Sequence, residues 1–298
     1  MLQLLVLAGV GLVAQLVDGS LGMGQGVIST SLLLAAGMAP ATASASVHLA
    51  KIGTTVASGT AHWRFGNVDW RVVGRIAVPG MIGAAAGAAA LSWISTAAAA
   101  PWMAFVLFVL GGYILVRFTT RGIPQPSGHG PPRRGLLAPL GLAAGFVDAT
   151  GGGGWGPVAT PALLASGRME THRVIGSVAT SEFAVACAAS VGFLATLGAR
   201  GVSWLAVAVL LVSGVIVAPV AAWLVRRIPA RMLGSAVGGV IILTNAHTLL
   251  GQFELAQGWQ AATYVILTGV WFLALGVSMR AVVRERSAAA TSVEAEPV

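Results

Sequence analysis

Long apolar stretches dominate the sequence and leave little room for any other kind of segment. In chain order they cover residues 2–17, 27–37, 43–61, 72–94, 98–116, 136–147, 158–164, 174–197, 202–225, 232–250 and 259–279. A transmembrane helix needs about 20 apolar residues, and most stretches approach that length. Only 9% of the 298 residues are charged and 56% are hydrophobic, so polar side chains are too few to cover a water-soluble globule. We therefore predict an all-α, polytopic membrane protein.

Three of these stretches are too short to cross a bilayer. Residues 27–37, 136–147 and 158–164 fall short of the length that spans about 30 Å at about 1.5 Å per residue. Each adjoins a cluster of glycines, so we predict broken or re-entrant helices there, among about 8–11 membrane segments. Residues 1–17 lack a basic start and a convincing cleavage site, and we interpret them as structure and not as a removable signal peptide.

Basic residues fall almost entirely on one side of the predicted membrane. Of the 17 Lys and Arg residues, Arg200 alone falls on the other side, and Lys51 lies within an apolar stretch. The remaining residues are Arg64, Arg71, Arg75, Arg117, Arg121, Arg133, Arg134, Arg168, Arg173, Arg226, Arg227, Arg231, Arg280, Arg284 and Arg286. Lys and Arg gather in cytoplasmic loops, so we predict an inner (cytoplasmic) membrane protein with its N-terminus outside and its C-terminus cytoplasmic. Topology explains the net charge of +8 without a nucleic-acid partner.

The chain divides into two halves around a polar connection. Residues 119–135 are rich in Pro, Gly and Arg and are predicted to form a cytoplasmic linker. They separate a first transmembrane repeat, 1–118, from a second, 136–250. A further transmembrane helix is expected within 251–286, and the small, polar residues 287–298 are expected to be disordered.

The two halves match at an offset of 130 residues. The segment VDGSLGMGQG at 17–26 aligns with VDATGGGGWG at 147–156, and Thr30 and Gly37 align with Thr160 and Gly167. The predicted topology starts the first copy outside and the second inside, so the repeats are expected to be inverted. Inverted repeats with interrupted helices are typical of secondary transporters, whose sites form near the membrane midplane.

With these motifs the sequence resembles the TauE/SafE family, also called the sulfite exporter or toluene-sulfonate uptake permease family. The two glycine-rich segments, the small-residue stretches that follow them and GNVDW at 66–70 carry the resemblance. It covers nearly the whole chain, in both halves. The resemblance implies a multi-spanning transporter for small anions, chiefly sulfite, sulfonates and related organic acids.

The two glycine loops are the first candidate binding elements. If each lies at the midplane, the helix that follows directs free N–H groups and its positive dipole end into a cavity suited to an anion. The candidate substrate-binding residues of the loops are Ser20, Gly22, Gly24, Gln25, Thr150, Gly152, Gly154 and Trp155. The alternative is that the glycines only permit close helix packing.

Lys51 is the second candidate, because a charge inside an apolar stretch costs at least about 2.5 kcal/mol. At helical spacing one face of residues 43–61 and the turn beyond it carries polar side chains. They are Ser44, His48, Lys51, Thr55, Ser58 and His62. Lys51, with His48 and Thr55, is predicted to bind the anion, and His48 could carry protons near neutral pH. The alternative is that Lys51 pairs with Asp18 or Glu182 and only holds the bundle together.

Three acidic residues also lie inside the predicted membrane. Asp18 and Asp148 end helices at equivalent positions of the two copies, and they could either couple protons or cap the glycine loops. Glu182 falls opposite Lys51 in the repeat and could either relay a proton or hold Lys51. The sequence leaves both choices open.

These features together predict a secondary transporter of a small oxyanion, sulfite or an organosulfonate, that is driven by a proton gradient. A passive anion channel is the main alternative, because it could share the polar stripe. An intramembrane enzyme using Ser58 and His62 is remote, since no protease or zinc motif is present. We expect no enzyme activity, cofactor or metal, and partners limited to the anion, protons and the lipid bilayer. The single Cys187 excludes an internal disulfide.

Overall fold

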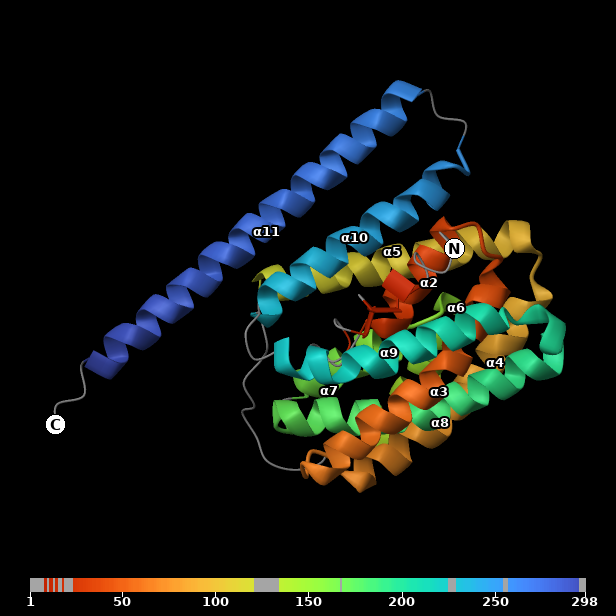
Figure 1. The fold of residues 1–298 in the computed structure, drawn as a ribbon, viewed down its shortest axis with the longest axis horizontal. Coiled ribbons are helices and arrows are strands. Elements are labelled where there is room, and N and C mark those ends of the chain that lie inside the picture. The colour runs from red at the N-terminus through yellow and green to blue at the C-terminus, as the bar shows by residue number, and fades with distance from the viewer. Residues whose placement is uncertain are drawn as a thin grey trace.

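A computed structural model describes residues 24–120, 134–166, 168–224, 229–253 and 257–294, with positions 8, 9, 11, 12, 14, 15 and 18. All regular structure within these residues is helical (Figure 1). The α-helices are α2 (Gln25–Ala35), α3 (Pro40–Arg64), α4 (Trp70–Trp93), α5 (Thr96–Thr120), α6 (Arg134–Gly151), α7 (Trp155–Ala165), α8 (Thr171–Leu197), α9 (Trp204–Leu224), α10 (Ala230–Leu250) and α11 (Gln257–Glu294). A short 3₁₀ turn, η1 (Ala199–Gly201), precedes α9. The predicted all-α class is confirmed.

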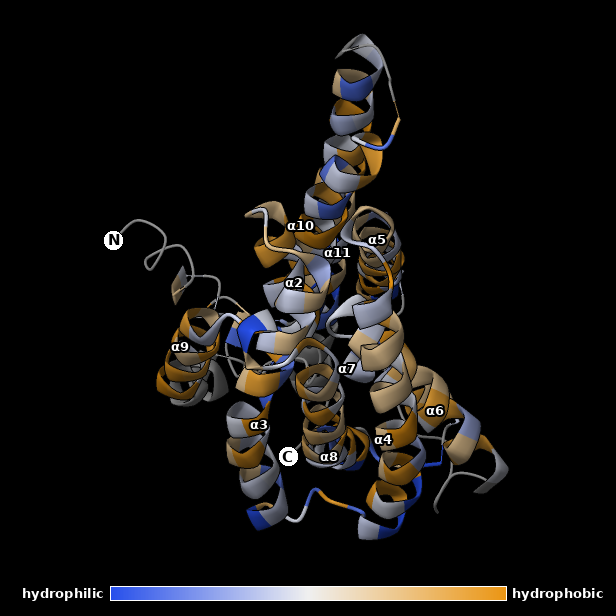
Figure 2. Cartoon of the chain, turned by 90° about the vertical axis from the view of Figure 1, so that its right-hand side faces the viewer, coloured by the Kyte–Doolittle hydropathy of each residue, from blue (hydrophilic) through white to orange (hydrophobic). Residues whose placement is uncertain are grey.

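Five described helices are long and apolar enough to cross a membrane. They are Trp70–Trp93, Thr96–Thr120, His172–Leu197, Arg231–Leu250 and Gly258–Glu285. Hydrophobic residues cover most of the helices, and hydrophilic segments lie at the adjoining ends of α3 and α4 (Figure 2). Helix α3 has 25 residues but is less apolar because it carries the polar stripe. The chain is thus a polytopic membrane protein, and the expected 8–11 segments stay a prediction.

Two helices are too short to span a bilayer, as the sequence predicted. Helices α2 and α7 have 11 residues each, which is about 16 Å at the α-helical rise. Each follows a glycine loop with left-handed backbone, at Gly24 (φ 133°) in one loop and at Gly152 (φ 71°) and Gly153 (φ 159°) in the other. These angles favour glycine, so the glycines interrupt the helices as expected.

The third expected short segment is longer than its apolar stretch. Residues 136–147 belong to α6, which has 18 residues and continues to Gly151. The polar residues beyond Val147 do not end the helix, since the Thr150 hydroxyl donates to the Phe146 carbonyl one turn back (2.8 Å). Such bonding within the same helix satisfies a buried hydroxyl without breaking the backbone pattern. At about 27 Å, α6 still falls short of a bilayer core of about 30 Å, and it is grouped with the shorter apolar helices.

Equivalent helices of the two halves have matching lengths or opposed directions. Helices α2 and α7 begin and end 130 residues apart. Helices α3 and α8 run antiparallel, since His48 lies against Phe193 while Gly59 lies against Thr180. Helices α5 and α10 are also antiparallel, with Thr119 hydrogen-bonded to Ser235 and Gly111 against Ile241. An inverted repeat requires these relations, and the repeat itself stays a prediction.

Glycines bring α4 close to two parallel neighbours. A Cβ on Gly83 would overlap the Leu142 carbonyl of α6, and one on Gly145 would overlap the Gly80 carbonyl of α4. Small residues such as these glycines permit backbone contact between membrane helices. Helix α4 also packs on α8. Just before α4, the Asp69 N–H donates to the Ser177 hydroxyl (2.9 Å), and at the other end of the two helices the Thr196 hydroxyl donates to the Ser92 hydroxyl (2.8 Å).

Helix α11 lies along the outside of the bundle beside α10 and extends past it (Figure 1). Ser278 and Ser235 join the two helices through their hydroxyls (2.7 Å), and the Trp271 indole donates to the Ser235 carbonyl (3.1 Å). The helix continues to Glu294, and the disorder expected for the tail 287–298 stays a prediction. The alanines of that stretch favour continued helix.

The remaining domain boundaries stay predictions. Helix α5 ends at Thr120 and α6 begins at Arg134, which agrees with a connection near 119–135. Most of that connection lies outside the described residues.

Close packing of α4 on α6 gives a first testable prediction. We expect Gly83→Ala to lower the free energy of unfolding by roughly 1–3 kcal/mol, because the new Cβ collides with a carbonyl that cannot move freely. Gly74→Ala is the matched control on the same helix, since no atom lies within 4 Å of its Cβ position. Thermal unfolding in detergent compares the two, and equal stabilities would contradict this packing.

Candidate functional site

Lys51 lies on α3 and is held by two carboxylates from other helices. Its ammonium Nζ is 3.2 Å from Asp148 Oδ1 of α6 and 2.5 Å from Glu182 Oε1 of α8. The Lys51 side chain is 2% exposed and that of Asp148 is fully buried. A buried ammonium needs such partners because its hydration is lost. These ion pairs therefore tie α3, α6 and α8 together at one point.

His48 extends this cluster one turn along α3. Its Nδ1 lies 2.8 Å from the Ser44 carbonyl and its Nε2 lies 3.0 Å from Asp148 Oδ2. The Ser44 hydroxyl donates its single hydrogen to the Ala149 carbonyl (2.7 Å). A carbonyl only accepts, so Nδ1 is the donor in its contact with Ser44. His48 therefore bridges the α3 backbone and the Asp148 carboxylate.

Asp148 also closes the amino-terminal end of α7. Its Oδ1 accepts the backbone N–H groups of Gly154 (2.8 Å) and Trp155 (3.0 Å). With Lys51 and His48, these bonds give the carboxylate four hydrogen-bond donors. The equivalent residue, Asp18, accepts the Gln25 N–H at the start of α2 (3.3 Å). Carboxylates suit helix N-termini because free N–H groups and the helix dipole favour negative charge there.

The start of α2 touches the glycine loop before α7 next to Lys51. A Cβ on Gly26 would lie 2.5 Å from the Gly153 Cα and 3.3 Å from Lys51 Nζ. A Cβ on Gly153 would overlap the Gly26 backbone. The Thr30 hydroxyl donates to the Gly152 carbonyl (2.6 Å) and fastens α2 to the opposite loop. The starts of both short helices and the buried ammonium therefore converge in one place.

Several predicted binding residues already have partners within the bundle. Gln25 accepts a hydrogen bond from Thr54 through Oε1 (2.9 Å), and the Thr55 hydroxyl donates to the Lys51 carbonyl (2.6 Å). Trp155 is fully buried, and its indole N–H donates to the Val178 carbonyl (3.1 Å). The Thr150 hydroxyl is bonded within α6. In this conformation these four side chains serve packing and helix contacts.

The other predicted residues divide between described and undescribed parts of the chain. Gly24 and Gly154 precede α2 and α7 directly, and the Gly154 N–H donates to Asp148. Ser20 and Gly22 lie outside the described residues. On the α3 stripe, Ser44, His48, Lys51 and Thr55 are buried, whereas Ser58 and His62 are half-buried. The stripe thus turns inward at its first four members.

Sequence reasoning gave no role to three residues that join the short helices to the bundle. Thr30 and Thr54 bond the opposite loop and Gln25, as described above. Ser31 of α2 accepts a hydrogen bond from the Asn245 amide of α10 (2.8 Å). The match of Thr30 with Thr160 across the repeat was a usable signal for Thr30. For Thr54 and Ser31 the sequence held no such signal, because their hydrogen-bond partners lie 29 and 214 residues away.

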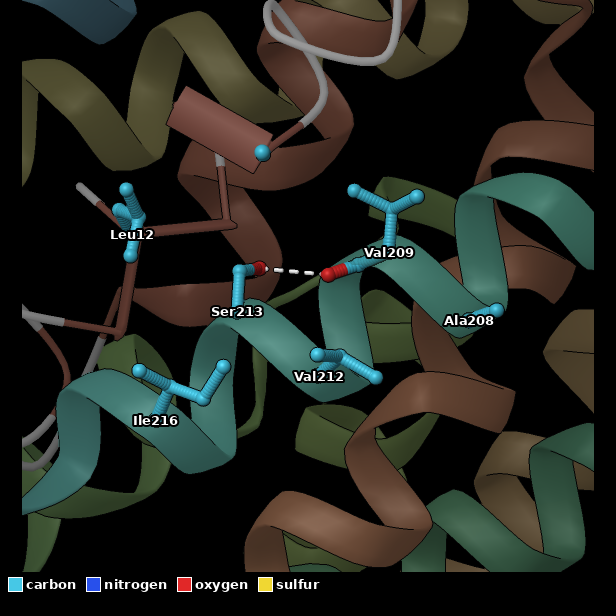
Figure 3. Close-up of a pocket in the computed structure, with 7 residues that line it drawn as sticks. Leu12, Ala208, Val209, Val212, Ser213 and Ile216 are labelled. Carbon is cyan, nitrogen blue, oxygen red and sulfur yellow. Dashed lines mark hydrogen bonds between the residues drawn. The ribbon is translucent and has the colours of Figure 1, made fainter.

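An apolar groove of about 430 Å³ lies elsewhere, on α9 and the segment before α2 (Figure 3). Its lining residues are Ala8, Leu12, Ala208, Val209, Val212, Ser213 and Ile216. The one polar side chain among them, Ser213, bonds the Val209 carbonyl of its own helix (2.6 Å). The groove shares no residue with the ion-pair cluster of Lys51, His48, Asp148 and Glu182, which we call the Lys51 cluster. The residues that line the groove offer no charged group to an anion. No group of three metal-ligating side chains is found among the described residues.

Breaking the Lys51 cluster gives a second testable prediction. We expect Asp148→Asn to lower the free energy of unfolding by about 3 kcal/mol or more, because Lys51 and His48 both lose a buried partner. Asp18→Asn is the matched control, since Asp18 accepts one long hydrogen bond at the equivalent position. Adding Lys51→Met to Asp148→Asn should recover part of the loss. Denaturant unfolding measures all three variants, and equal losses for Asp148→Asn and Asp18→Asn would contradict this role.

Comparison with known proteins identifies the family. The model of the sulfite exporter TauE/SafE family matches residues 7–248. The chain is 49% identical over 276 residues to the probable membrane transporter protein YtnM of Bacillus subtilis (strain 168), covering 92% of each chain. No solved structure matches significantly. The match spans both halves and the whole Lys51 cluster, so the chain belongs to the sulfite exporter TauE/SafE family of membrane transporters.

Proposed function

We propose that the protein is a secondary transporter of small anions across the cytoplasmic membrane, with a proton as the coupled ion. The observation that carries this proposal is the convergence of α2, α7 and Lys51. Two helix starts and an ammonium bring together hydrogen-bond donors that an anion could use once the internal carboxylates release them. The family description and the name of the Bacillus relative support transport.

The chemistry of this site favours a small oxyanion. Sulfite and sulfonates carry several acceptor oxygens on one compact group, which suits backbone N–H groups and an ammonium at short range. Asp148 and Glu182 occupy these donors in the described state. An incoming anion must therefore compete with internal carboxylates, and it gains the donors only when the carboxylates move or lose charge.

Proton coupling follows from that competition. Protonation of a carboxylate weakens its hold on Lys51 and leaves the ammonium available to another anion. A proton and an anion thus favour each other's binding, which is the thermodynamic requirement for cotransport. His48, whose Nε2 lies 3.0 Å from Asp148 Oδ2, belongs to the same network.

We favour alternating access over a standing pore. Lys51, His48, Asp148 and Trp155 are all 2% exposed or less, and the start of α2 and the loop before α7 leave no room for a Cβ between Gly26 and Gly153. A channel would need a continuous water-filled pore past these groups. Opposed rocking of two inverted repeats would instead expose the site to one side at a time, with the N-terminus outside and the C-terminus cytoplasmic.

Reconstitution tests this function. Proteoliposomes whose outside is more acidic than their inside should take up and accumulate sulfite, methanesulfonate or a small carboxylate. We expect Lys51→Met to reduce that uptake to the level of empty liposomes, because the central cation is lost. Thr60→Ala should transport like the wild type, since Thr60 is exposed on the same helix and bonded to the Val56 carbonyl. Size-exclusion profiles check that both variants fold.

Two results would defeat this proposal. The first is a folded wild-type protein that moves none of these anions under any proton gradient. The second is a conductance far above carrier rates that persists without a proton gradient, which would indicate a channel.

A further inference from the structure

We propose that Glu182 is the residue that carries the coupled proton, and that protonated Glu182 releases Lys51 to a substrate anion, so that one proton accompanies each monovalent anion. This inference rests on the proposed function and assigns its coupling step to one carboxylate. The sequence left open whether Glu182 relays a proton or only holds Lys51.

The hydrogen bonds of the two carboxylates on Lys51 differ. Asp148 accepts from Lys51, His48 and two backbone N–H groups, and its side chain is fully buried. Among the described residues, Lys51 is the sole partner of Glu182, whose side chain is 11% exposed. Hydrogen bonds to the charged form stabilise a carboxylate. Asp148 is therefore fixed as an anion, and Glu182 can exchange its partner for a proton.

The charges around Glu182 also favour a proton there. Lys51 and His48 of α3, Asp148 of α6 and Asp18 are the titratable groups close to it. Helix α7, which packs on α8, carries none, and the arginines of α4 at 71 and 75 lie in its first two turns. Three carboxylates thus face at most two cations. A proton on Glu182 reduces this excess of negative charge, in surroundings where unbalanced charge is costly.

The coupling step can be written with its proton balanced. A proton from water binds a Glu182 carboxylate oxygen, and the Lys51 ammonium loses that charged acceptor. The freed N–H of Lys51 then donates to an oxygen of the anion beside the starts of α2 and α7. After the site opens to the other side, the anion leaves, Glu182 returns its proton to water, and the Glu182–Lys51 pair forms again. No covalent bond to carbon or sulfur changes.

The test separates exchange of the anion from its accumulation. Methanesulfonate is a suitable probe because it stays ionised and so releases no proton of its own. A gradient of one pH unit supports about tenfold accumulation by a carrier that moves one proton with each monovalent anion. We expect Glu182→Gln to exchange internal for external methanesulfonate at a rate independent of pH, yet to accumulate none. Glu182→Asp should keep accumulation at a reduced rate.

Two controls keep the inference open to refutation. Ser190→Ala, a buried polar change on the same helix, should preserve both exchange and accumulation. Proton uptake by the purified wild-type protein, followed with a pH indicator dye, should be one per methanesulfonate bound.

Each outcome has a distinct meaning. Accumulation by Glu182→Gln, loss of exchange by the folded variant, or binding without proton uptake would overturn the role of Glu182. If the wild-type protein shows neither exchange nor accumulation of any tested anion, the proposed function itself fails.

Discussion

The carboxylate of Asp148 is the interaction on which the centre of this molecule depends. It joins a lysine and a histidine of α3 to the first N–H groups of α7, and it lies on α6. Each of these groups would be costly to bury alone, because a low-dielectric interior penalises unpaired charge and unsatisfied N–H groups. Together they satisfy one another. The interruption between α6 and α7 is therefore stable within the bundle, although it places irregular backbone away from water.

Close backbone contact makes this arrangement possible. The start of α2 and the loop before α7 touch with only hydrogens between their backbones at Gly26 and Gly153. Any larger side chain there would push the short helices apart and away from Lys51. In the same way, glycines that face backbone carbonyls allow α4 to pack directly on α6. Glycine thus has two uses in this chain: left-handed backbone at the loops and close approach along the helices.

Much of the site could be predicted from the sequence because intramembrane charges are expensive and therefore conspicuous. Lys51, His48, Asp148 and Glu182 all stood out in apolar surroundings, and their helical spacing or repeat position was readable. Their pairing was only partly readable. The sequence offered Asp18 or Glu182 as the partner of Lys51, and the structure shows Glu182 with Asp148, which lies 97 residues from Lys51. Trp155 and Thr150, expected to line a cavity, are bonded to the bundle itself. Helix α6 is longer than its apolar stretch, because composition alone does not show where a helix stops.

The sequence by itself determined that the protein lies in a membrane, that it is helical, and which family it belongs to. Those follow from hydrophobicity, charge placement and local motifs, which act over one turn or one membrane span. Only the tertiary structure decided which carboxylates hold Lys51, where the start of α2 touches the loop before α7, and which polar side chains are already satisfied. The first two depend on contacts between residues about 100 or more positions apart, for which the periodicity of one helix carries no information. Of the four donors to Asp148, Lys51 and His48 come from such contacts, whereas the N–H groups of Gly154 and Trp155 follow Asp148 closely in the chain.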